Sequence, residues 1–230
     1  MSSPSADVPI PQVLSVNLAR VQPNPYKGLK ITGIEKIGTS DPVEVRAPGP
    51  KKGGLGSGLV GDQIGDRQHH GGDDQAVYAY AREDLDVWQE RLGRNLASGS
   101  FGENLTTLNL DVNGARVGER WRIGDTLELQ VTDPRVPCAT FRGWIAERGW
   151  LKTFTAAAIP GTYLRVVTPG PVRTGDPITV TYRPDHDVTV ALVFRAITRE
   201  PELLPHLLAA ADLPAETREM AERGQTFSLG

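Results

Sequence analysis

Cysteine is almost absent from this sequence of 230 residues, because Cys138 is the only one. A single cysteine excludes an intramolecular disulfide and any zinc or iron–sulfur site built from several cysteines. It also fits a reducing compartment, where unpaired thiols persist. Whatever chemistry a thiol performs in this chain therefore belongs to Cys138.

Long apolar runs and a strong net charge are also missing. No stretch approaches the ~20 apolar residues needed to span a bilayer, and the Ser- and Pro-rich residues 1–12 lack the apolar core of a secretory signal. The formal net charge of −3 gives no indication of nucleic-acid binding. We therefore expect a cytoplasmic protein without nucleic-acid or membrane partners.

Glycine and proline are plentiful, at 25 and 18 residues, and they favour a turn-rich, mostly β protein with helices, of the α+β class. We expect a disordered tail over residues 1–11, a β-rich domain over 12–184 and a helical appendage over 185–230. The hydrophobic patterns predict strands at 13–18, 31–37, 43–46, 76–81, 126–132, 163–167 and 178–182. They predict helices at 82–92, 141–148, 150–158, 190–198, 202–210 and 215–223.

The three C-terminal helices raise the alternative of a DNA-binding helix-turn-helix. Their charge argues against it, because residues 185–230 contain eight carboxylates and only four arginines. Phosphate contacts require the opposite sign. We expect an appendage that packs on the β-rich domain or binds partners.

The thiol of Cys138 follows a strongly patterned strand. Residues 126–132 alternate apolar and polar side chains, and Pro134 and Pro137 then prevent a helix or a continued strand. A rigid loop thus presents the thiol, and Arg135 nearby favours the thiolate, which is the nucleophilic and metal-binding form. The alternative is that Cys138 is a small buried hydrophobe.

A second candidate stretch contains two adjacent histidines and two glycines, His69, His70, Gly71 and Gly72. Neighbouring residues of an extended chain point to opposite faces, so we do not expect the two histidines to bind one metal together. The glycines would let backbone N–H groups approach an anion. A polar turn with surface histidines explains the pattern equally well.

Two further motifs are ambiguous. Gly56, Gly58 and Gly61 match G-x-G-x-x-G, but no strand enters and no helix follows, so a dinucleotide site is rejected in favour of a flexible loop. Glu103 and Asn104 lie between apolar residues. They either face a ligand or bond to the backbone of their own loop.

Taken together, these motifs resemble the MOSC family, named for the C-terminal domain of molybdenum-cofactor sulfurases. The matching stretches are 61–72, 75–77, 101–105 and 134–138, and the resemblance covers roughly residues 30–184. The three-helix tail resembles that of a bacterial subgroup of the family.

The resemblance implies a twisted β-barrel that binds the molybdenum cofactor (molybdopterin), with Cys138 as thiolate ligand to molybdenum and catalytic residue. It implies reduction of small N-hydroxylated compounds, such as amidoximes and hydroxylaminopurines, with electrons from an external redox protein. The candidate cofactor-binding residues are His69, His70, Gly71, Gly72, Glu103, Asn104, Arg135 and Arg142.

Two other functions compete with this reductase. The first is a non-catalytic carrier of the cofactor, or of sulfur as a Cys138 persulfide, and the second is a structural module. Pyridoxal phosphate is sometimes associated with sulfurases, but we do not favour it, because no lysine lies in a recognisable Schiff-base context. The lysines are Lys27, Lys30, Lys36, Lys51, Lys52 and Lys152.

Overall fold

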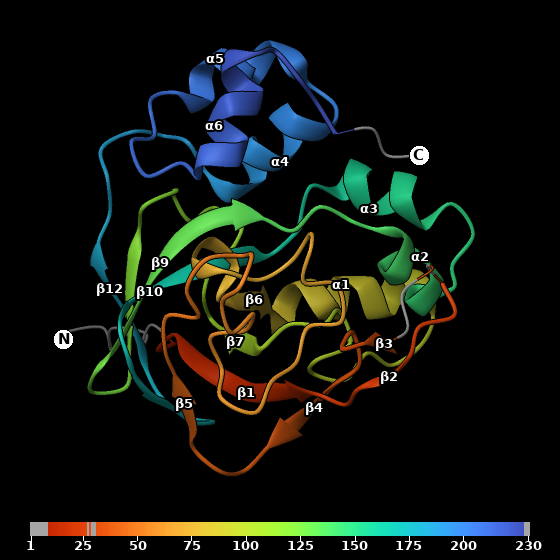
Figure 1. Cartoon of the computed structure of the whole chain (residues 1–230), viewed down its shortest axis with the longest axis vertical. Helices are drawn as coiled ribbons and strands as arrows, with labels where there is room; N and C mark the ends of the chain where they lie inside the picture. The colour runs from red at the N-terminus through yellow and green to blue at the C-terminus, as the bar shows by residue number, and fades with distance from the viewer. Residues whose placement is uncertain (1–8, 27, 29–30, 228–230) are drawn as a thin grey trace, which may run out of the picture.

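The computed structural model describes residues 9–26, 28 and 31–227, so most of the predicted disordered tail, residues 1–8, lies outside the described residues (Figure 1). The strands are β1 (Gln12–Ala19), β2 (Gln22–Pro23), β3 (Ile31–Thr32), β4 (Lys36–Thr39), β5 (Val43–Val45), β6 (Val77–Ala81), β7 (Leu105–Leu108), β8 (Arg120–Ile123), β9 (Leu127–Pro134), β10 (Thr162–Thr168), β11 (Gly170–Val172) and β12 (Ile178–Tyr182). The α-helices are α1 (Arg82–Leu92), α2 (Ala139–Ile145), α3 (Trp150–Ala157), α4 (Val190–Thr198), α5 (Leu204–Leu207) and α6 (Ala215–Glu222).

Eight strands form one mixed sheet in the order β12-β8-β9-β10-β6-β7-β1-β4. All neighbours are antiparallel except β6 and β7, which are parallel and are joined through α1. A parallel pair requires such a crossover connection, because a tight turn can only reverse the chain. The α+β class predicted from the sequence is confirmed.

The sheet is open, which corrects the expected barrel. Within the described part of the chain, the sheet ends in β12 on one side and β4 on the other, and these two strands do not pair. The predicted strand 31–37 is in fact divided, because β3 pairs with β2 while only the four residues of β4 join β1. Gly33 lies at the break, where a Cβ would come within 2.2 Å of the Gln63 carbonyl oxygen.

Three groups of buried side chains hold the fold together. The first fills the inside of the curved sheet and includes Val13, Trp121 and Leu129. The second, called here the aromatic cluster, joins β6 to the first three helices and is Tyr78, Tyr80, Trp88, Phe101, Phe141, Trp150, Phe154 and Phe194. The third lies among α4, α5 and α6 and also takes in Val117. Figure 1 shows these three helices gathered beside β9.

Several helices differ from their predicted bounds. The predicted helix 202–210 is a 3-10 turn, Pro201–Leu203, followed by the short α5. Helix α2 begins at Ala139, two residues earlier than predicted, so Cys138 occupies its N-cap position. Among the described residues, no helix is both long and apolar enough to cross a membrane.

Candidate functional site

Cys138 lies at the junction of two cavities. Its half-buried thiol borders an inner pocket of about 120 Å³, under the loop of residues 57–71, and an outer cleft of about 750 Å³ that reaches the C-terminal helices. His70, Gln75 and Tyr163 line both cavities together with Cys138. The thiol is therefore accessible from two sides and is not sealed in the core.

The surroundings of Cys138 favour its thiolate form. Burial by itself raises the pKa of the thiol. A hydrogen bond with His70 and the positive charge of Arg135 outweigh burial and lower the pKa from 9.0 to about 6. Because the thiolate binds metals and attacks electrophiles, this environment suits either role.

Arg135 is almost fully buried behind the thiol and faces the inner pocket. Its guanidinium stacks on the ring of Phe141 at 3.8 Å, lies 5.3 Å from the centre of the Tyr78 ring, and donates to the Phe101 carbonyl oxygen. Cation–π contacts of this kind hold a guanidinium in one orientation. The charge of Arg135 is thus fixed beside Cys138.

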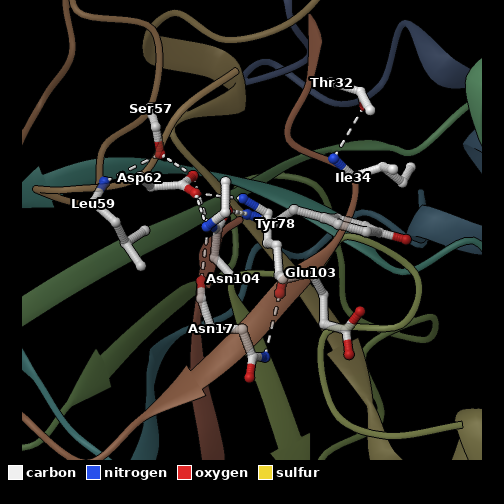
Figure 2. Close-up of polar contacts among 11 residues, drawn as sticks. Asn17, Thr32, Ile34, Ser57, Leu59, Asp62, Tyr78, Glu103 and Asn104 are labelled. Carbon is white, nitrogen blue, oxygen red and sulfur yellow. Dashed lines mark hydrogen bonds and ion pairs between the residues drawn. The ribbon is translucent and has the colours of Figure 1, made fainter. Parts of the chain in front are cut away.

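A buried ion pair forms another wall of the inner pocket. The Lys36 ammonium lies 2.6 Å from Asp62, whose carboxylate also accepts from the Ser57 hydroxyl at 2.7 Å, the Asn104 amide at 2.9 Å and the Ala19 N–H at 2.8 Å. Figure 2 shows Ser57 and Asn104 converging on Asp62. Burial raises the pKa of Asp62, but Lys36 and the donated hydrogen bonds hold it below 3.8. The pocket therefore has a charged, rigid wall.

Glu103 and Asn104 are buried, but they have different partners. Glu103 accepts from the N–H groups of Gly99 and Phe101 and from the Thr106 hydroxyl, so it organises its own loop, as the structural alternative predicted. Asn104 lines the inner pocket and accepts from the Tyr78 N–H at 3.2 Å, as Figure 2 shows. Only Asn104 of this pair can contact a ligand there.

The two glycines are required by packing. Gly71 and Gly72 both have positive φ, and a Cβ on either would come within 2.8 Å of backbone atoms of Gly56 or Lys51. Their N–H groups donate to Gln75 and to the Gly56 carbonyl. These donors are already used within the protein, so the pair shapes the turn that places His70.

The remaining candidates, His69 and Arg142, lie outside the inner pocket. His69 is exposed, pairs with Asp66 at 3.0 Å and borders the outer cleft. Arg142 follows Cys138 by one turn of α2, because its N–H donates to the Cys138 carbonyl, and it lines the cleft as well. The structure thus gathers Cys138, His70, Asn104 and Arg135 at the inner pocket and separates His69 and Arg142 from it.

Sequence reasoning missed several residues of these cavities. Asp62 falls inside the glycine- and histidine-rich stretch, but no role was predicted for it. Lys36 lies in β4, which is far from Cys138 in the sequence, and Tyr163 lies in β10. Only the sheet topology brings these two residues to Cys138. The helical wall of the outer cleft was missed for the same reason.

The donor set at this site is a single soft thiolate. Among the described residues, no group of three or more His, Cys, Asp or Glu side chains is arranged to hold a metal ion. A lone thiolate can carry sulfur, act as a nucleophile, or ligate a metal whose other ligands come from a cofactor. The geometry by itself allows all three.

The chain is similar to a known domain family and to several known sequences. The model of the MOSC domain matches residues 66–179. The uncharacterized protein YflK of Bacillus subtilis is 30% identical over 184 residues, which cover 80% of this chain and 79% of YflK. A protein named "Reductase" from Gibberella moniliformis is 27% identical over 214 residues, but these are 91% of this chain and only 36% of that protein.

The fold has been seen before in crystals. YiiM from Geobacillus stearothermophilus superimposes with a TM-score of 0.74 at 24% sequence identity, over 93% of this chain and 98% of that one. The match covers nearly all of both chains. At this identity the likeness shows a common fold.

Proposed function

Because the chain belongs to the MOSC domain family, we propose that it binds the molybdenum cofactor through Cys138 and reduces small N-hydroxylated compounds. The observation that carries the proposal is the position of the thiol, half-buried, between two cavities. The proposal places the cofactor and the substrate on the two sides of the thiol. The relative named as a reductase supports the reaction class.

The residues at the inner pocket fit such a cofactor. Cys138 supplies a soft thiolate, the ligand type that suits a sulfur-bound metal. Arg135 and His70 hold the thiolate deprotonated, and Asn104 borders the space in which the pterin would lie. The bound cofactor would supply the two-electron chemistry, and the chain supplies orientation and electrostatics.

The overall reaction converts an N-hydroxyl group to N–H and water, and it consumes two electrons and two protons. An external redox protein is the proposed electron donor. The chain's own contribution is to hold the N-hydroxyl group beside Cys138 and to keep the surrounding charges fixed. The buried pair of Lys36 and Asp62 serves the second purpose.

A test measures molybdenum per chain after expression in a host that makes the cofactor. We expect about one molybdenum per chain in the wild type and a loss in Cys138→Ser. Val180→Ser, on exposed β12, is the matched control and should load normally. Thermal unfolding of all three proteins checks that the fold is retained.

The assays that follow separate the competing functions. Turnover of an amidoxime with a reduced viologen dye supports the reductase. Molybdenum without turnover, or sulfane sulfur on Cys138, favours the carrier. Absence of molybdenum from the wild type, while a known molybdenum enzyme in the same cells is loaded, contradicts the proposal.

A further inference from the structure

The outer cleft has one wall that belongs to the C-terminal helices. Four residues of α6, namely Glu216, Thr217, Glu219 and Met220, line it. They recur at the spacing that places side chains on one face of a helix. The opposite wall is the loop that carries Cys138. A molecule that reaches the thiol through this cleft therefore touches α6.

Helix α6 is fixed by polar contacts to the end of β9, the strand that leads into the Cys138 loop, and to Lys51. The Thr217 hydroxyl donates to both carboxylate oxygens of Asp133 at 2.9 Å. Glu216 accepts from the Lys51 ammonium at 2.7 Å. The chain after α6 is also attached, since the Phe227 N–H donates to the Ile197 carbonyl at 2.7 Å. These contacts hold α6 in place as one wall of the cleft.

The surface offered to a ligand in this cleft is mainly apolar. Its carboxylates already have partners, because Asp133 accepts from Thr217, Glu216 pairs with Lys51 and Glu219 pairs with Arg223. The apolar lining residues include Val136, Pro137, Leu151, Ile197, Met220 and Phe227. Phe227 is 44% exposed, and Met220 adds a polarizable thioether that adapts to flat rings.

From this arrangement we propose that the α6 side of the cleft, through Met220 and Phe227, selects N-hydroxylated substrates with an aromatic body. For the identity of the reacting group, this inference rests on the proposed function. The N-hydroxyl group faces Cys138, and the aromatic ring lies against the apolar wall. Among the described residues of this wall, a cationic body finds no unpaired carboxylate, and a small aliphatic body leaves the wall uncovered.

The test compares benzamidoxime with acetamidoxime, which has the same reacting group and a methyl in place of the ring. Equilibrium binding to the cofactor-free chain, followed by ligand NMR, needs no turnover. We expect wild type to bind benzamidoxime at least tenfold more tightly. Met220→Gln and Phe227→Ser should each weaken benzamidoxime binding about tenfold, about 1.4 kcal/mol, and leave acetamidoxime unchanged.

Leu208→Gln provides the control, because Leu208 is a similarly exposed apolar residue of the C-terminal helices outside the cleft. It should bind both oximes as wild type does. In the molybdenum-loaded protein, the two cleft variants should raise KM for benzamidoxime and keep kcat, as loss of uniform binding does.

Equal affinity of the wild type for the two oximes, or unchanged benzamidoxime binding in both cleft variants, overturns the inference. A failure of molybdenum loading is a separate result, since binding is measured on the cofactor-free chain. Thermal unfolding identifies any variant that has lost its fold. If Met220→Gln does not fold, Phe227→Ser still tests the inference, because Phe227 is at an exposed site.

Discussion

Asp133 is a half-buried carboxyl group near the end of β9, where α6 contacts it. Burial raises its pKa to about 7, the Thr217 hydrogen bond opposes this rise, and the neighbouring charges of Asp74 and Glu216 add to it. The Lys51 ammonium lowers the pKa of Asp133. The folded protein therefore holds the proton of this group more tightly than the unfolded chain, whose ordinary value is 3.8.

This difference predicts how stability depends on pH. A raised pKa of an acid contributes stability that is fully present below the unfolded value and is lost as the pH rises through the folded value. Asp133→Asn removes this titration. The unfolding free energy of the variant, relative to that of the wild type, should therefore rise between about pH 4 and about pH 7. Urea unfolding across this range measures the difference.

In the difference between the unfolding free energies of the variant and the wild type, the contributions of all other groups cancel, provided that the substitution leaves their titration unchanged. Thr217→Val, which removes the hydroxyl donor but keeps the carboxyl, is the matched variant and should retain the pH dependence. A difference between wild type and Asp133→Asn that stays constant from pH 4 to pH 8 would contradict the prediction.

At the residue scale, local sequence identified Cys138, His70 and Arg135 because proline, glycine and charge mark them within short stretches. It could not separate the roles of Glu103 and Asn104, which are neighbours with different surroundings. Nor could it identify Lys36, whose partner Asp62 lies in another segment. Contacts between distant segments depend on topology, and a local pattern contains no information about them.

At the scale of elements, the aromatic cluster positions α2, the helix that Cys138 caps. Phe141 of α2 and Phe154 of α3 have ring centres 5.1 Å apart, and Phe154 also stacks on Trp88 of α1 at 5.8 Å. All three side chains are fully buried. Burial of large rings dominates the energetics of such a core.

Truncation of one ring should therefore be costly. We expect Phe154→Ala to lower the unfolding free energy by about 3–5 kcal/mol, because it removes buried apolar surface and leaves a cavity among three helices. Val87→Ala, on the exposed side of α1, should cost far less. Urea unfolding at one pH provides both values, and a loss below 1 kcal/mol in Phe154→Ala would mean that the cluster is not tightly packed.

The elements most accurately predicted were those with a strong repeating pattern. The bounds of α1 and α4 agree with the predicted helices 82–92 and 190–198, since their apolar residues follow the helical period. The short strands β7 and β11 were missed, because three or four residues are too few to show alternation. The predicted strand 31–37 was wrong as one element, because the chain turns away near Gly33.

At the scale of the molecule, the C-terminal helices share buried surface with the loops that precede β8 and follow β9. Val117 and Val136 pack with side chains of α4, α5 and α6, and the Val117 N–H donates to the Val188 carbonyl. The division of the chain at residue 184 stays a prediction. These contacts nevertheless show what a cut at that point would expose.

We expect a chain truncated after Pro184 to bind a hydrophobic dye and to unfold at lower temperature than the full chain, because it exposes the apolar side chains that α4–α6 cover. A full-length chain with Leu208→Ala, which alters only a half-exposed side chain at the C-terminal end of α5, serves as the control. A truncated protein that unfolds like the full chain would show that the helices are an independent unit.

The place of β1 in the sheet has a consequence for synthesis. β1 lies between β4 and β7, and the residues next to it also bond to the chain near Pro177. Its first partner, β4, follows closely, but β7 and the Pro177 segment leave the ribosome much later. Because such distant pairings form slowly and exposed strand edges aggregate, the nascent chain carries one open edge of β1 until β7 has been made, and chaperone capture during that interval would protect it.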